Sequence, residues 1–221
     1  SLLASTLESY FRGERELFEG LKMMKLEEEW TQYPVLRLDL SGTKHAGVQG
    51  VKDELVRLIR DFEKVYGRDE AETTPGMRFA GVVNRAYEQT GRQVAVIIDE
   101  YDAPLLDVLH EDELLKEMRE VMQEFYQRLK MLEPKIKFCF ITGITKFSQL
   151  SIFSTINNLT NITMEPVFST ICGITEDELT TVMSDDIKML AEVYEETPEK
   201  MKERLKLQYD GYHFSRSASD V

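Results

Sequence analysis

Hydrophobic residues recur along much of the chain with the spacing of amphipathic helices. Apolar side chains that return every three or four positions share one face of a helix. Gly13, Gly67 and Gly91 follow three such segments, and Pro134 follows a fourth, so each has a stop signal. We expect these helices at residues 3–11, 51–62, 79–87 and 112–132, and a helical or irregular segment at residues 23–30.

Short apolar runs lie between the helices. Val94–Ile98 is a run of five apolar residues, mostly β-branched, and such a run leaves no face for water. It predicts a strand buried on both sides within a parallel sheet. A second buried strand is expected at residues 137–143, a short one at 33–40 and a last one at 162–164. Strands that alternate with helices predict an α/β fold.

Two acids, Asp99 and Glu100, come directly after the central strand. The carboxyl ends of parallel strands are where open α/β sheets bind their ligands. The pair is typical of a Walker B strand, in which Asp99 would hold Mg²⁺ and Glu100 would polarise the attacking water. A second interpretation stays open, in which the two acids only open a turn or cap the next helix. Asp39, at the end of an earlier strand, is expected to bond to its own turn.

Composition narrows the class of protein. The 221 residues suffice for one large domain, alone or with a small appendage, and the net charge of −13 does not indicate a nucleic-acid surface. Cys139 and Cys172 offer neither metal-ligand spacing nor a disulfide framework, which favours reduced thiols and a cytoplasmic protein. Three distant histidines argue against a histidine-rich metal centre. No apolar run is long enough for a membrane span, so no membrane partner is expected.

Four ordered blocks of the sequence resemble the AAA-ATPase-like family of bacterial proteins, a branch of the P-loop ATPases. The resemblance covers nearly the whole chain. The blocks are residues 33–39, which begin Tyr-Pro-Val, residues 96–105 with Asp-Glu-Tyr-Asp-Ala-Pro-Leu, residues 140–147 with Phe-Ile-Thr-Gly-Ile-Thr-Lys-Phe, and residues 209–214 with Tyr-Asp-Gly-Tyr-His-Phe.

The resemblance implies a P-loop NTPase fold of the RecA/AAA type, a parallel sheet sandwiched by helices with a small C-terminal helical lid. We expect residues 1–172 to form the ATPase-like domain, incomplete at its N-terminus, and residues 173–221 to form the lid region. The charged tail from Thr175 to Tyr209 is expected to be helical, and Thr175 and Glu178 look like a capping box.

Site residues follow from the same resemblance. The family's phosphate loop ends in Gly-Lys-Ser followed by Leu-Leu, and Ser1 begins such a sequence here, so Ser1 would bind Mg²⁺ together with Asp99. Glu100 would orient the attacking water. Thr142 falls on the sensor position, which contacts the γ-phosphate or that water. The implied ligands are ATP and Mg²⁺.

Other positions have weaker assignments. Thr145 and Lys146 are candidate nucleotide contacts, although Lys146 also fits an ordinary solvated charge. His213 matches a family motif but is expected to be a packing residue. An arginine finger has four candidates without distinguishing context: Arg78, Arg85, Arg119 and Arg128.

One departure from the family pattern matters. No G-x-x-x-x-G-K-[ST] occurs in these residues. We therefore expect residues upstream of Ser1 in the natural protein, and we expect these residues alone neither to bind ATP tightly nor to hydrolyse it. The absent phosphate-loop strand would lie beside the strand at 137–142, where each unpaired buried backbone group costs about 1–3 kcal/mol. We expect the sheet either to have a gap beside the strand at 137–142 or to be completed there by residues from another part of the protein. A sheet that continues through a strand at Ile162 would argue against this expectation.

The sequence thus predicts an ATPase-like nucleotide-binding module, and whether the full-length protein is an enzyme stays open. The alternative is a non-catalytic scaffold or regulatory module with a vestigial nucleotide site and a protein partner. Many family members continue into a nuclease-like domain of the PD-(D/E)xK type, which is a further possible partner. A metal-dependent hydrolase built on Asp99, Glu100 and Asp102 is disfavoured, because alternate strand positions point to opposite faces.

Overall fold

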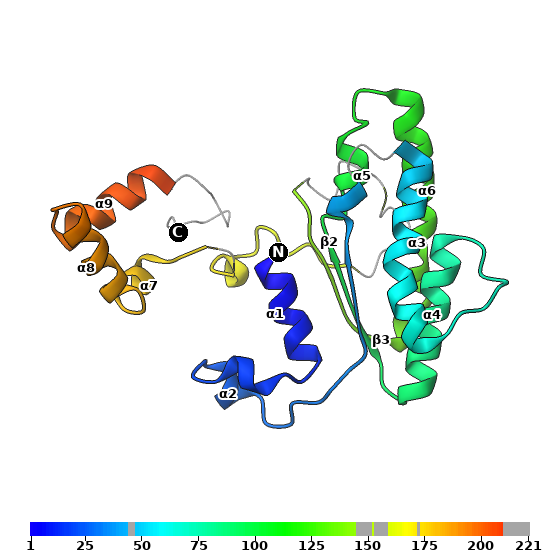
Figure 1. Cartoon of the computed structure of the whole chain (residues 1–221), viewed down its shortest axis with the longest axis horizontal. Coiled ribbons are helices and arrows are strands. Elements are labelled where there is room, and N and C mark those ends of the chain that lie inside the picture. Colours follow the sequence, from blue (N-terminus) through cyan, green and yellow to red (C-terminus); the bar gives the residue numbers. More distant parts are fainter. Residues whose placement is uncertain (44–46, 145–151, 153–158, 172, 210–221) are drawn as a thin grey trace. The chain divides into compact units, whose positions relative to one another are not determined.

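The structure is a computed structural model that describes residues 1–43, 47–144, 152, 159–171 and 173–209 (Figure 1). Its contacts divide the chain into two compact units, residues 1–159 and residues 160–221. The domain boundary expected between residues 172 and 173 stays a prediction. In the described part of the chain, no helix combines the length and apolarity needed to cross a bilayer.

The first unit is an α/β structure built on a parallel sheet. Its strands are β1 (Val35–Asp39), β2 (Val94–Asp99) and β3 (Ile136–Ile141), in the order β1-β2-β3. All six residues of β2 are buried, as the run of β-branched residues predicts. The register places Asp39 beside Asp99 and Ile98 beside Ile141, so the three strands end at the same edge of the sheet.

The prediction of full burial is wrong for β3. Lys137 is exposed and the other residues of β3 are only partly buried. Within the described residues β3 pairs with β2 alone, so its outer side lacks the neighbour that would cover it. The short strand expected at residues 162–164 is also wrong, because Asn161 accepts a hydrogen bond from the N–H of Thr163 and holds a turn there. A further strand beside β3 stays a prediction.

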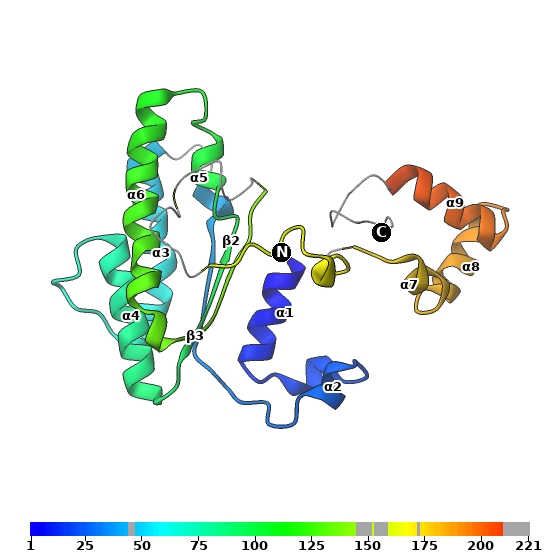
Figure 2. The ribbon, with the colours of Figure 1, turned by 180° about the vertical axis from the view of Figure 1, so that it is seen from behind.

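Helices cover both faces of the sheet (Figures 1 and 2). Helices α3 (Gly47–Tyr66), α4 (Pro75–Thr90) and α6 (Asp112–Met131) bury one face in the main core. Phe79 and Phe125 lie at the centre of this core, with ring centroids 5.1 Å apart. On the other face α1 (Leu2–Phe11) packs Ala4 and Phe11 against Val35, Ala95 and Ile97.

Local signals set the ends of these helices. Thr74 caps α4 by accepting a hydrogen bond from the N–H of Met77, and Pro75 follows at the first helical position. Gly91 ends α4 in the left-handed conformation, with φ of 65°. The segment at residues 23–30 is mostly irregular, with a single helical turn, α2 (Met23–Leu26). The remaining short elements of this unit are η1 (Arg15–Phe18), η2 (Leu40–Thr43), α5 (Ala103–Leu106) and η3 (Glu133–Lys135).

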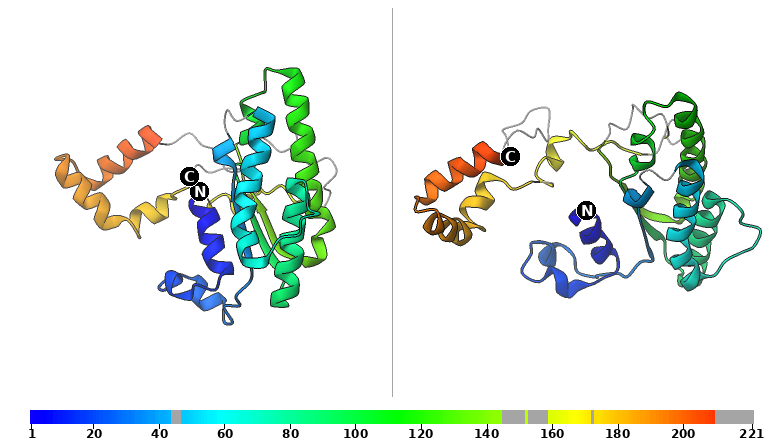
Figure 3. Two further views of the ribbon diagram at one scale, coloured as in Figure 1. Left: turned by 45° about the vertical axis from the view of Figure 1, so that its right-hand side comes forward. Right: turned by 45° about the horizontal axis from the view of Figure 1, so that its top comes forward.

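The second unit is helical. It contains η5 (Pro166–Phe168), α7 (Glu176–Thr180), α8 (Ser184–Val193) and α9 (Pro198–Tyr209), and Figure 3 shows α7, α8 and α9 from two directions. The predicted capping box is confirmed: Thr175 accepts from the N–H of Glu178, and the Glu178 carboxylate accepts from the N–H of Thr175. Ile187, Ala191 and Met201 are its buried apolar residues among those described.

Candidate functional site

The carboxyl end of β2 meets the start of α1. Asp99 ends β2 with a side chain that is 6% exposed, and its Oδ2 accepts a hydrogen bond from the terminal ammonium of Ser1 at 2.5 Å. Ser1 also caps α1, because its Oγ accepts from the N–H of Ala4 at 3.4 Å. The fold therefore brings together Ser1 and Asp99, two residues 98 positions apart that the sequence predicts to share a magnesium ion.

Glu100 turns the chain immediately beyond β2. Its backbone adopts a left-handed conformation with φ of 51°, which is uncommon for a residue other than glycine. Its carbonyl accepts a hydrogen bond from the N–H of Ala103 at 3.0 Å, and α5 follows. The two acids thus do open a turn. That role is compatible with catalysis, since strained backbone is common in active sites.

Thr142 lies at the end of β3, tied to the same turn. Its N–H donates to the carbonyl of Ile98 at 2.9 Å, and its own carbonyl accepts from the N–H of Tyr101 at 3.0 Å. These two bonds fasten the residues on either side of Glu100 to the tip of the neighbouring strand. Glu100 and Thr142 therefore belong to one hydrogen-bonded edge, as their positions after parallel strands predict.

A buried polar cluster lies beneath this edge, and the sequence alone does not reveal it. Asp102 is 1% exposed and Tyr126 is fully buried, with its hydroxyl donating to the carbonyl of Tyr101 at 3.3 Å. Burial raises the pKa of Tyr101 to about 12 and that of Tyr126 well above its usual value, so both phenols stay protonated. A Cβ at Gly143 would collide with Oδ1 of Asp102 and would lie 2.5 Å from Cδ1 of Tyr101.

The remaining predicted residues fall in different places. Asp39 accepts from the N–H of Ser41 at 2.9 Å, which confirms its expected role in a turn. Thr145, Lys146 and His213 lie outside the described residues. No three His, Cys, Asp or Glu side chains group around one point in the described ranges.

The structure distinguishes the four candidate arginines. Ion pairs join Arg78 to Glu63, Arg85 to Glu72 and Arg128 to Glu124. Among the described residues, Arg119 on α6 has a buried Nε that finds no hydrogen-bond partner, as does Arg85. Arg78, Arg85 and Arg128 thus each have a carboxylate partner, and the role of an arginine finger stays a prediction for all four.

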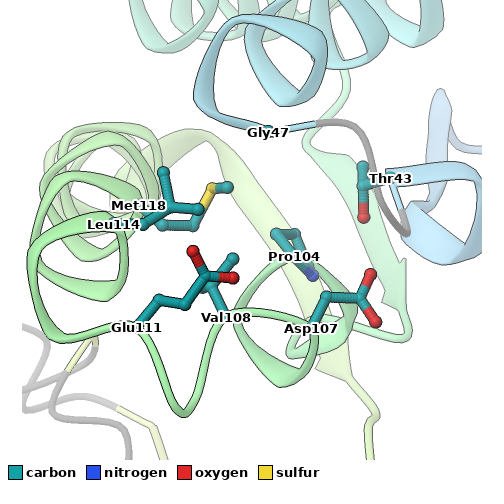
Figure 4. A pocket seen from close by; sticks show the side chains of 8 residues that line it. All are labelled: Thr43, Gly47, Pro104, Asp107, Val108, Glu111, Leu114 and Met118. Carbon is teal, nitrogen blue, oxygen red and sulfur yellow. The ribbon is translucent and has the colours of Figure 1, made fainter.

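A cavity of about 300 Å³ lies between η2, α5 and the first turns of α6 (Figure 4). Its lining is largely apolar, with the carboxylates of Asp107 and Glu111 among the labelled side chains. The lining residues are Thr43, Gly47, Pro104, Asp107, Val108, Glu111, Leu114 and Met118. The sequence alone gives no sign of this cavity, because its walls come from separate elements.

Comparisons with known proteins give a family and one distant relative. A family model described as "Predicted AAA-ATPase" matches residues 1–153. A protein of Azotobacter chroococcum mcd 1, described as "Uncharacterized protein in vnfD 5'region", is 28% identical over 218 residues, which are 99% of this chain and 40% of that protein. The chain thus spans 40% of the length of this relative. No solved structure matches the chain.

Proposed function

Because the chain belongs to the AAA-ATPase-like family, we propose that it is the nucleotide-binding part of an ATPase, with ATP and Mg²⁺ bound at the carboxyl ends of β2 and β3. The observation that carries the proposal is the position of Ser1, whose Oγ caps α1, next to Asp99 at the end of β2. A hydroxyl and a carboxylate are oxygen ligands of the kind that Mg²⁺ prefers, and Mg²⁺ needs only one or two carboxylates when phosphates and water complete its shell. The residues present therefore fit the ion.

The position of α1 supports the same proposal. A helix N-terminus carries free N–H groups and the positive end of the helix dipole, which together favour phosphate. The ten-residue helix α1 begins at the edge of the sheet where Asp99 lies. Bound Mg²⁺ would supply charge neutralisation at the phosphates.

Glu100 and Thr142 are the proposed catalytic residues. Glu100 would accept a hydrogen bond from the attacking water, and Thr142 would donate its hydroxyl to the γ-phosphate or to that water. Their shared hydrogen-bonded edge would keep the two groups in a fixed relation, which favours an ordered attack. The helices α7, α8 and α9 are the candidate lid, an assignment that rests on the resemblance alone. Residues 1–221 contain no Gly-Lys-Ser sequence, so none of them is proposed to form the phosphate loop.

The test is calorimetry of Mg²⁺ and ATP binding to the protein expressed from its complete reading frame, with phosphate release measured in parallel. Glu100→Gln should keep nucleotide binding and lose most turnover, because the amide cannot act as a base. Glu117→Gln, an exposed position on α6, is the matched control and should behave as wild type. Equal turnover in both variants would refute the role of Glu100. Absence of ATP binding in every form would refute the ATPase and favour the scaffold.

A further inference from the structure

Four aromatic side chains from two separate segments surround one hollow at the far end of α1. Tyr10 and Phe11 come from the last turn of α1, whereas Trp30 and Tyr33 come from the irregular segment that leads into β1. The hollow has a volume of about 170 Å³ and is completed by Glu27, Glu29, Thr31 and Lys137. Aromatic side chains and charged groups thus line the same hollow.

The rings are held at angles to one another. Tyr10 meets Trp30 edge to face with centroids 5.9 Å apart, and Phe11 meets Tyr33 in the same manner at 6.0 Å. Phe18 packs behind Trp30 at 5.1 Å and so supports the indole from outside the hollow. Phe11 is buried and stacks on Phe138 with centroids 4.9 Å apart, so the partly exposed rings of Tyr10, Trp30 and Tyr33 are the ones left to attract a cation.

Hydrogen bonds hold one of the two acidic groups, Glu27, in place. The hydroxyl of Tyr10 donates to Oε2 of Glu27 at 2.5 Å, and the N–H of Glu29 donates to Oε1 of Glu27 at 3.2 Å. The hydrogen bond from Tyr10 lowers the pKa of Glu27, so this carboxylate stays ionised, whereas the same bond raises the pKa of Tyr10 to about 12. With the exposed Glu29, the border carries two negative charges against the single positive charge of Lys137.

Lys137 already shows what the rings attract. Its ammonium nitrogen lies 5.6 Å from the centroid of the Tyr33 ring, within the range of a cation–π contact. Lys137 is exposed, so its position over the ring is one of several open to a long side chain. A ligand cation would therefore compete with Lys137 for the same surface.

The backbone around the hollow is constrained. Trp30 has a φ of 41°, an unusual value for a bulky residue. Its carbonyl oxygen packs so closely on Gly13 that a Cβ there would lie 2.8 Å away, and the N–H of Tyr33 donates to the carbonyl of Phe11 at 2.8 Å. Backbone strain of this kind persists only where the surroundings enforce it, and it is concentrated at binding sites.

We propose that this aromatic box, formed by Tyr10, Phe11, Trp30 and Tyr33, binds a small organic cation such as a quaternary ammonium group. The hollow is large enough for a few water-sized groups, which suits a trimethylammonium head and excludes a nucleotide. The cation is either a free small molecule or the methylated lysine of a peptide, and both present the same head group. The box lies at the opposite end of α1 from Ser1, about 15 Å away by the rise of a ten-residue helix.

The chain provides its own reporter, because Trp30 is its single tryptophan. We would titrate the protein with choline at constant ionic strength and follow the emission of Trp30. The uncharged isostere of choline, in which carbon replaces the quaternary nitrogen, is the matched control ligand. Choline should bind saturably in the millimolar range, and the isostere should not. A peptide with trimethyllysine, titrated beside choline, separates the two sources of the head group by which of them binds more tightly.

Charge variants keep the test decisive even if a ring substitution disturbs folding. Glu29→Gln should weaken choline binding and Lys137→Gln should strengthen it, each by roughly threefold, as expected for one charge about 6 Å from the ligand and screened as in bulk water. Glu28→Gln, an exposed neighbour that does not line the box, is the control and should change nothing. Trp30→Leu, followed by calorimetry, should abolish binding.

Two results would overturn the proposal. One is equal binding of choline and its isostere, which would mean that the hollow takes any apolar group. The other is choline affinity that does not respond to Glu29→Gln and Lys137→Gln in opposite directions. Neither result bears on ATP binding, so this site and the proposed nucleotide site can fail independently.

Discussion

The ion pair between Arg78 and Glu63 is expected to be a main determinant of stability. It joins α4 to α3 through two hydrogen bonds of 2.7 and 2.5 Å, and the two side chains are only 6% and 5% exposed. Glu63→Gln would leave the buried guanidinium without a counter-charge. Removing one partner of a buried pair costs about 3–5 kcal/mol, so we expect a loss of about 3 kcal/mol in the free energy of unfolding. For a chain of this size that is a fall of roughly 6–12 °C in Tm.

The assay is urea unfolding followed by circular dichroism, with Asp61→Asn as the control. Asp61 lies on the same helix, α3, but its pair with Lys64 is about two-thirds exposed on both sides, so its loss should have little effect. A double variant, Glu63→Met with Arg78→Met, replaces the pair with apolar side chains and should recover much of the loss. The reasoning is refuted if Glu63→Gln behaves like Asp61→Asn, or if the double variant is less stable than either single variant.

Two further predictions concern pH and a close contact. The hydrogen bond from Arg78 lowers the pKa of Glu63. The contribution of Glu63 to stability is therefore complete above the ordinary glutamate pKa of 4.5 and is lost as the pH falls through the lowered pKa of the folded state. The difference in unfolding free energy between wild type and Glu63→Gln should narrow below about pH 4.5, and a difference that stays constant in urea titrations down to pH 3 would contradict this. Gly143→Ala should lower the free energy of unfolding by about 1–3 kcal/mol, because the new Cβ would press on Tyr101 and Asp102. Unchanged urea unfolding would contradict this, because it would show that the turn accommodates the methyl group without loss of stability.

Local patterns predict the elements of this chain well because their causes are local. Val94–Ile98 is buried for the reason its composition implies, and Gly91 ends α4 in the left-handed conformation that glycine favours. The burial of β3 is harder to predict, because it depends on which strands pair with β3, and the sequence of a strand alone does not reveal its neighbours in the sheet. At residues 162–164 the side chain of Asn161 offers the backbone a turn, which competes with strand pairing.

The same distinction between local and non-local causes applies to the residues of the candidate site. Asp99 and Glu100 are visible in the sequence because they follow a strand directly, and their proposed roles stay predictions. The left-handed backbone of Glu100 and the closeness of Asp102 to Gly143 occur in the segments that follow β2 and β3, and the sequence spacing does not predict them. The aromatic box is also invisible in sequence, since Tyr10 and Trp30 come from segments that each look like ordinary packing.

Helix α1 touches both proposed sites, and this has a thermodynamic consequence. Ser1 at one end contacts Asp99, and Tyr10 and Phe11 at the other end form half of the aromatic box. A ten-residue helix moves as a stiff body, so a ligand that shifts one end also shifts the other. If a cation in the box changes the affinity for Mg²⁺ and ATP by some factor, the nucleotide must change the affinity for that cation by the same factor. Helix α1 would then couple the two sites, so that the binding of either ligand changes the affinity for the other.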